Sequence, residues 1–138
     1  MQAVVLDAPH WAQLEQVQLQ VNQQVAFATD QQAWGKAEYW EPAQRLGDCE
    51  DIALLKRQRL MKLGWPAEAL RIAVAKDERG ALHALLTVDV TAMDGRPETY
   101  ALDNRVVHVE PWRALSEYGY RWIERQKPGS SAWVSLGG

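Results

Sequence analysis

The stretch GDCEDIALLKRQRLMKLGWP, residues 47–66, decides the fold, because it joins a reactive residue type to the clearest helix signals in the chain. Asp48 suits the N-cap of a helix, and Asp51 lies three positions later, where it forms a variant of the capping box. Gly64 suits the position just after a helix, where a positive φ is common. The stretch therefore predicts a helix that begins at Asp48 and carries Cys49 in its first turn.

Cys49 is the only cysteine of the chain, so it cannot form an internal disulfide. A helix N-terminus favours a thiolate, whereas like-charge repulsion from Asp48, Glu50 and Asp51 would disfavour it. Carboxylates grouped this closely are also the hard oxygen ligands that Ca²⁺ prefers, and a bound dication would cancel the repulsion. Two readings stay open: a calcium site beside a reactive thiol, or acids that only cap the helix and face solvent.

The flanking sequence predicts an α+β fold. Apolar residues recur at helical spacing over residues 9–28, and residues 30–42 resemble a loop rich in aromatics, with Trp34, Tyr39 and Trp40 as a groove or as core. After Pro66 the apolar period changes to that of strands. Strands are expected near residues 70–74, 81–90, 99–102, 106–109, 120–126 and 132–136. Helices followed by a run of strands indicate an antiparallel sheet packed against helices.

Length and charge narrow the class of protein. The 138 residues fit one domain over residues 1–138. A net charge of −3 and a pI near 5.6 argue against a nucleic-acid partner. No apolar run approaches the roughly 18 residues that span a bilayer, so no membrane insertion is expected. The first six residues lack the basic segment of a signal peptide, which leaves a cytoplasmic protein or a processed one.

A thiol nucleophile needs a base to take its proton and a group that orients the base. His83 is expected in an apolar strand, where a histidine is more often a satisfied core residue, and Asp103 precedes Asn104 as in a simple turn. If neighbouring strands pair as hairpins, His83 and Asp103 lie side by side on one sheet face. Catalysis by Cys49, His83 and Asp103 and a purely structural role both stay open on spacing alone.

Seven short motifs resemble those of the bacterial transglutaminase-like cysteine proteinases. In chain order they are DQQAWG at 30–35, EYW at 38–40, GDCED at 47–51, LGWP at 63–66, LHALL at 82–86, LDN at 102–104 and WVSL at 133–136. The resemblance covers about residues 21–136. It implies a papain-like, transglutaminase-like core whose cysteine helix packs on an antiparallel sheet, with Cys49, His83 and Asp103 as the catalytic triad.

The resemblance also implies a biological setting. The best-understood relatives are periplasmic proteases that cut large surface adhesins and so release the biofilm. They need calcium, and an inner-membrane receptor for cyclic di-GMP sequesters them. In those relatives, acidic residues at the positions of Asp48, Glu50 and Asp51 are calcium ligands. The residues after Asp51 and the tail at 125–127 are closer to a second branch, so the adhesin substrate and the receptor are the weaker part of the expectation.

The sequence therefore predicts a calcium-dependent thiol endopeptidase in the periplasm, with a surface adhesin as its model substrate. Two alternatives keep the same fold: an acyltransferase or amidase on another substrate such as a cell-wall peptide, and a non-catalytic, calcium-sensitive binding module. For the oxyanion, the backbone N–H of Cys49 is the expected donor. Gln31, Gln32 and Trp34 are side-chain donors to test.

Overall fold

The computed structural model describes the backbone of residues 4–33 and 42–137, and the side chains of residues 4–25 and 48–137. Two long helices come first and a run of strands follows. In chain order the elements are α1 (Ala8–Ala33), α2 (Pro42–Lys62), a short 3₁₀ turn η1 (Ala67–Ala69), β1 (Leu70–Lys76), β2 (Leu82–Thr91), β3 (Pro97–Leu102), β4 (Glu110–Pro111), α3 (Trp112–Tyr118), β5 (Arg121–Gln126) and β6 (Trp133–Ser135). None of the described helices is long and apolar enough to cross a membrane.

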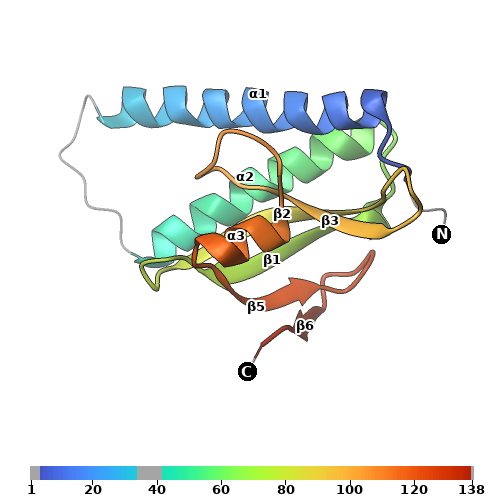
Figure 1. The fold of residues 1–138 in the computed structure, drawn as a ribbon. Coiled ribbons are helices and arrows are strands. Elements are labelled where there is room, and N and C mark those ends of the chain that lie inside the picture. The colour runs from blue at the N-terminus through green and yellow to red at the C-terminus, as the bar shows by residue number, and fades with distance from the viewer. Residues whose placement is uncertain (1–3, 34–41, 138) are drawn as a thin grey trace.

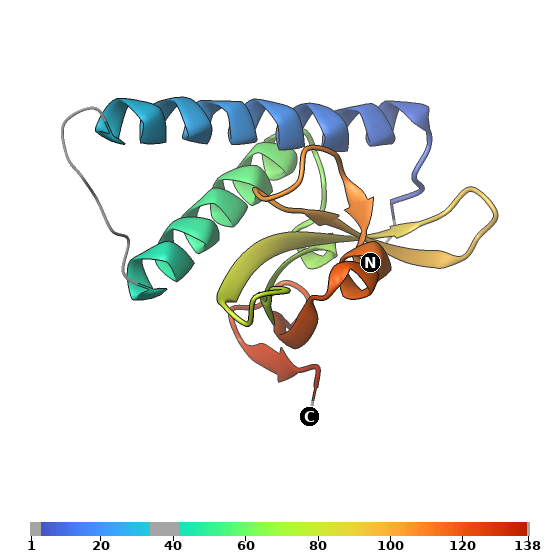
Figure 2. The ribbon, with the colours of Figure 1, turned by 60° about the vertical axis from the view of Figure 1, so that its left-hand side comes forward.

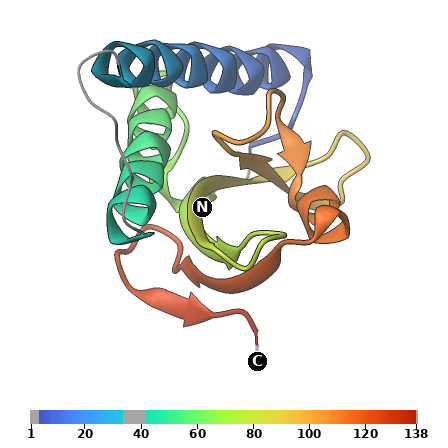
Figure 3. The same ribbon diagram turned by 90° about the vertical axis from the view of Figure 1, so that its left-hand side faces the viewer.

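All six strands form one antiparallel sheet in the order β4-β3-β2-β1-β5-β6. Figure 1 shows α1 above α2 on one side of this sheet, and Figure 3 shows that the sheet curves strongly, with β5 and β6 below β1. The expected α+β architecture and the antiparallel sheet are confirmed. The period-2 pattern located β1, β2, β3, β5 and β6 because each of these strands has at least one face in the core.

Both faces of the sheet are covered. Side chains of α1 and α2, among them Leu14, Val21 and Ala53, pack against Leu86 and Val88 of β2. The other face packs under α3 and β5, and its buried residues are Ala75, Leu85, Ala101, Leu115 and Tyr120. Successive residues of β2 therefore alternate between two cores, which is why this strand is nearly all apolar.

The expected start of the cysteine helix is wrong. α2 begins at Pro42 rather than at Asp48, so Cys49 lies in the interior of the helix and Asp48 does not cap it. Proline is well suited to a first helical position, and the residues that follow it are good helix formers, so the helix continues through Gly47. The expected end is confirmed: α2 ends at Lys62, and Gly64 has a φ of 102°.

Two further expectations are corrected. α1 continues to Ala33, so residues 30–33 are helical and not part of a loop, while Trp34, Tyr39 and Trp40 lie outside the described residues. Residues 106–109 form no strand but a loop, which Figure 2 shows rising toward α1. The carbonyl oxygen of Val106 accepts hydrogen bonds from the side chains of Gln18 and Asn22, so this backbone bonds to a helix instead of a neighbouring strand.

Candidate active site

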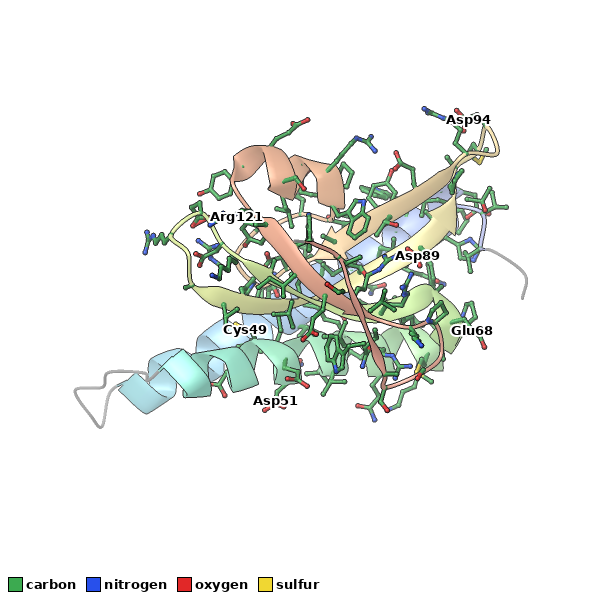
Figure 4. The ribbon with its side chains drawn as sticks, turned by 90° about the horizontal axis from the view of Figure 1, so that it is seen from below. Cys49, Asp51, Glu68, Asp89, Asp94 and Arg121 are labelled. Carbon is green, nitrogen blue, oxygen red and sulfur yellow. The ribbon has the colours of Figure 1, made fainter. Side chains whose placement is uncertain are left out.

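Cys49 lies on the face of α2 that packs on the sheet. Its side chain is buried, and it belongs to the same core as Ala53, one turn further along the helix. In Figure 4 Cys49 is on the side of α2 toward the strands, whereas Asp51 is on the opposite side. The helix therefore presents the thiol to the first residues of β2 and directs the neighbouring carboxylate away from it.

His83 is the second residue of β2 and stands against Cys49. The turn after β1 brings His83 opposite Ala75 in the hairpin, and the imidazole is buried. Its Nδ1 is 3.1 Å from Cys49 Sγ, and its Nε2 is 2.6 Å from Asp103 Oδ1. The three residues that the sequence singled out thus form one continuous line of hydrogen bonds.

Asp103 follows directly after β3 and is completely buried. Its Oδ1 also accepts the backbone N–H of Arg105 at 2.9 Å, and its Oδ2 accepts the Tyr120 hydroxyl at 2.7 Å. Both carboxylate oxygens are therefore bonded, which fixes the plane of the carboxylate and, through it, the imidazole of His83.

The charges of this line follow from its hydrogen bonds. Burial alone would lower the pKa of His83, but its hydrogen bonds to Asp103 and Cys49 outweigh burial and raise the pKa to about 9. Burial would raise the pKa of Asp103, yet the hydrogen bond and charge of His83, with the Arg105 N–H and the Tyr120 hydroxyl, hold it below its usual value. At neutral pH, Asp103 is a carboxylate and His83 carries a proton on both nitrogens.

Tyr120 and Arg105 are site residues that the sequence did not indicate. Arg105 Nη1 donates to the Tyr120 hydroxyl at 2.9 Å, and its guanidinium pairs with Glu78 and lies 3.5 Å from Asp77 in the β1–β2 turn. Arg105 therefore ties the turn before His83 to the loop after Asp103. Tyr120 begins an apolar strand and Arg105 follows an Asp-Asn turn, and neither position carries a recognisable signal in a single sequence.

From the opposite side, α1 holds the main chain of the same loop. Gln18 Nε2 donates to the carbonyl oxygens of Asp103 and Val106, at 2.8 and 2.9 Å, and Asn22 Nδ2 is 3.2 Å from each. The helical pattern placed most glutamines of α1 on the solvent face, but Gln18 is completely buried. Since both of its N–H groups are bonded to carbonyls, Gln18 does not donate to a substrate oxyanion.

The other histidines lie elsewhere. His10 Nδ1 is 2.6 Å from Asp7 within the first turn of α1, and His108 Nδ1 is 3.1 Å from Glu15 on the surface. The residues expected to be oxyanion donors are not supported either. An N–H inside a helix bonds to the carbonyl four residues earlier, so the N–H of Cys49 is not free. The side chains of Gln31 and Gln32, and all of Trp34, lie outside the described residues.

Asp48, Glu50 and Asp51 do not fit one metal ion together. Asp48 is half-buried and the other two are exposed. Because α2 continues through them, successive side chains are rotated by about 100° around the helix axis and diverge. Among the described residues, no group of three or more His, Cys, Asp or Glu side chains could hold a metal ion. No step of the chemistry below is therefore assigned to a metal.

Comparison with solved structures shows a shared fold. Legionella pneumophila LapG matches with a TM-score of 0.61 and 22% identity, over 91% of this chain and 69% of that chain. Its calcium-bound form matches with a TM-score of 0.57 and 22% identity, over 91% and 74%. The EGTA-treated form gives a TM-score of 0.61 and 21% identity, over 92% and 67%. No curated protein matches the sequence.

A family model gives the assignment. The model described as bacterial transglutaminase-like cysteine proteinase, BTLCP, matches residues 1–138, which is the whole sequence. The match agrees with the motifs around Cys49, His83 and Asp103 and with the α+β fold shared with LapG. This chain belongs to the bacterial transglutaminase-like cysteine proteinases, a family of cysteine peptidases.

Proposed function

We propose that this chain is a thiol endopeptidase in which Cys49 is the nucleophile, His83 the general base and acid, and Asp103 the residue that orients His83. The observation that carries the proposal is the line of hydrogen bonds from Cys49 Sγ through the imidazole to Asp103. Residues 1–138 would act as one peptidase domain.

The geometry fits the chemistry of an acyl-enzyme. With the pKa of His83 raised to about 9, the thiol proton rests on Nδ1 at neutral pH and Sγ is a thiolate paired with an imidazolium. The thiolate attacks the peptide carbonyl, and His83 returns the proton to the amine as the C–N bond breaks. His83 then takes a proton from water, which attacks the thioester and releases the carboxylic acid and the thiol.

Asp103 is assigned the orienting role because its Oδ1 accepts the Nε2–H of His83. This bond directs Nδ1 toward Cys49 and stabilises the imidazolium that the reaction needs. Tyr120 and the N–H of Arg105 keep the carboxylate in position, so they act through Asp103 and not on the substrate.

The substrate and the setting are further parts of the proposal. A cell-surface or periplasmic protein such as an adhesin, cleaved in the periplasm, is the substrate class that the sequence resemblance supports. Control by an inner-membrane cyclic di-GMP receptor rests on the same resemblance.

Calcium dependence also remains a proposal. It is supported by the motif GDCED at residues 47–51 and by the calcium-bound form of LapG. Asp48 and Asp51 are one helical turn apart and could share an ion, whereas Glu50 projects in another direction. Calcium titration by calorimetry, with Asp48→Asn as the matched variant, tests binding directly. Absence of heat in the unmodified protein would remove calcium from the proposal and leave the thiol chemistry intact.

The thiol chemistry is tested by labelling Cys49 with iodoacetamide between pH 5 and 10. A thiolate–imidazolium pair gives fast alkylation well below pH 8.5, the region where a free cysteine ionises. His83→Ala should return the profile to that of a free cysteine, and Cys49→Ser should show no labelling. A wild-type thiol that reacts only near pH 8.5 would overturn the proposal.

A second assay separates peptide hydrolysis from acyl transfer. The protein is incubated with a candidate adhesin fragment, and in parallel with a glutamine-containing peptide and a fluorescent amine. Cleavage of the fragment, lost in Cys49→Ser, supports the endopeptidase. Amine incorporation without cleavage would instead assign the same residues to an acyltransferase.

A further inference from the structure

Lys56 is a buried amine that the proposed mechanism does not use. It follows Cys49 by seven residues, which places it two turns along α2 on the same face. Its side chain is 0% exposed and is the largest of the fully buried ones. A lysine is almost never fully buried unless a partner compensates for the loss of water around its charge.

The partner of Lys56 is neutral. Lys56 Nζ donates to Gln18 Oε1 at 2.7 Å, and no carboxylate forms an ion pair with it among the described side chains. Gln18 in turn donates to the carbonyl oxygens of Asp103 and Val106. The ammonium group thus sets which way the Gln18 amide points, and the amide holds the main chain that carries Asp103.

The charges that act on Lys56 are those of the active site. Cys49, on its own helix, and Asp103, at the end of β3, both favour the ammonium form, and α1 presents the uncharged Gln18. Burial is stronger than both and lowers the pKa of Lys56 to about 7. Attraction works in both directions, so an ammonium here favours the negative charge on Cys49 and Asp103.

We propose that Lys56 is a positioning residue of the active site, which fixes the Asp103 main chain through Gln18 and favours the Cys49 thiolate from the protein interior. The proposal rests on the proposed function, because it assigns Lys56 a part in preparing the same nucleophile. It adds a fourth ionisable group, behind the line of Cys49, His83 and Asp103.

Stability and reactivity should separate when Lys56 is replaced. A buried charge without an ion-pair partner is costly, and an apolar side chain of similar length is often neutral or stabilising at such a site. Lys56→Met should therefore melt at the wild-type temperature or above it. A residue kept in place only for packing would show no accompanying change in the chemistry of Cys49.

The test is the pH profile of Cys49 alkylation by iodoacetamide, with EGTA present throughout, in wild type, Lys56→Met and the matched control Lys62→Met. Lys62 is exposed at the end of the same helix. In Lys56→Met the half-maximal pH should rise by about one unit, a roughly tenfold lower rate constant on the acidic limb. The profiles should converge on the alkaline plateau, and Lys62→Met should follow the wild type.

Two results would overturn the proposal. The first is an unchanged profile in Lys56→Met, and the second is a rate lowered by the same factor at every pH, which indicates a structural displacement. If Lys56→Met does not fold, Lys56→Gln replaces it, because a glutamine N–H still donates to Gln18 without the charge. A wild-type midpoint in Lys56→Gln would then reject the role of the charge.

The two proposals fail in different ways. A wild-type thiol that alkylates like a free cysteine overturns the proposed function and the role of Lys56 with it. A wild-type thiol that alkylates at low pH, unaffected by substitution of Lys56, overturns only the role of Lys56.

Discussion

Two buried cations lie against opposite faces of the sheet, and they are compensated in different ways. Arg125 of β5 is 9% exposed, and its Nη1 is 3.0 Å from Asp89 Oδ1. Its guanidinium also lies 4.6 Å from the centre of the Trp112 ring. Lys56, under α1, has only the amide oxygen of Gln18.

The difference shows how a buried charge can serve either the fold or the site. Asp89 also takes Arg71 at 3.1 Å, so the charges around Arg125 are neutralised by direct contact within the sheet. Lys56 is not neutralised by contact, so its field extends to Cys49 and Asp103. Arg125 is therefore expected to matter for stability and Lys56 for reactivity.

The largest effect is expected from Asp89→Asn, which leaves Arg71 and Arg125 next to each other without a counter-charge. Because Asp89 is 31% exposed, the loss should be about 2–3 kcal/mol, below that of a fully buried pair. This corresponds to a fall in melting temperature of roughly 6–9 °C. Calorimetry measures it, and Cys49 alkylation should not change.

Asp94→Asn is the matched control, since Asp94 pairs with Arg96 on an exposed turn. Its effect should stay within about 0.5 kcal/mol. Equal losses for Asp89→Asn and Asp94→Asn would contradict the contrast drawn here.

A smaller effect is expected in the pH dependence of stability. Between pH 7 and 10.5 folded Lys56 has lost its proton and unfolded lysine has not, so this group makes stability rise with pH. Between pH 6.5 and 9 folded His83 holds a proton that unfolded histidine has lost, so stability falls with pH. In the wild type the two trends oppose each other from pH 7 to 9.

Lys56→Met removes the rising trend and leaves that of His83. Its free energy of unfolding should fall by about 1–2 kcal/mol from pH 7 to 9, while that of the wild type stays nearly flat. Urea denaturation at pH 7, 8 and 9 measures both. Parallel curves for the two proteins would show that Lys56 does not titrate in this range. Arg125 takes no part, because an arginine stays charged at these pH values.

The smallest effect is expected from Tyr120→Phe. Tyr120 packs on the same sheet face as Arg125 yet donates to Asp103, so it shows whether that face also influences the site. Asp103 keeps its bonds to His83 and to the Arg105 N–H, so kcat/KM should fall only about threefold to tenfold. The exposed Tyr118 gives the control Tyr118→Phe, for which no change is expected. An equal kcat/KM for both variants would assign Tyr120 to packing alone.

Much of the fold follows from local pattern. Alternation located five of the six strands because their buried faces are apolar, and the motifs located Cys49, His83 and Asp103 in the order in which the sheet joins them. The paired strands β2 and β3 explain why His83 and Asp103, 20 residues apart, meet.

The parts that could not be predicted depend on contacts between distant segments. A lysine and a glutamine on amphipathic helices normally face solvent, and only the loop after β3 makes burial of Gln18 favourable. The start of α2 was misplaced because Asp48 has the chemistry of a cap while the preceding residues also favour a helix. Residues 106–109 have the composition of a strand but bond to side chains of α1.

The bond from Gln18 to the Asp103 carbonyl joins residues that are 85 positions apart in the chain. Contacts this distant close the longest loops and form late when a small domain folds. The β2–β3 hairpin, by contrast, needs only its own turn and can pair His83 with Asp103 early. In a refolding experiment, the return of a reactive Cys49 thiol would therefore time the docking of α1 and not the formation of the sheet.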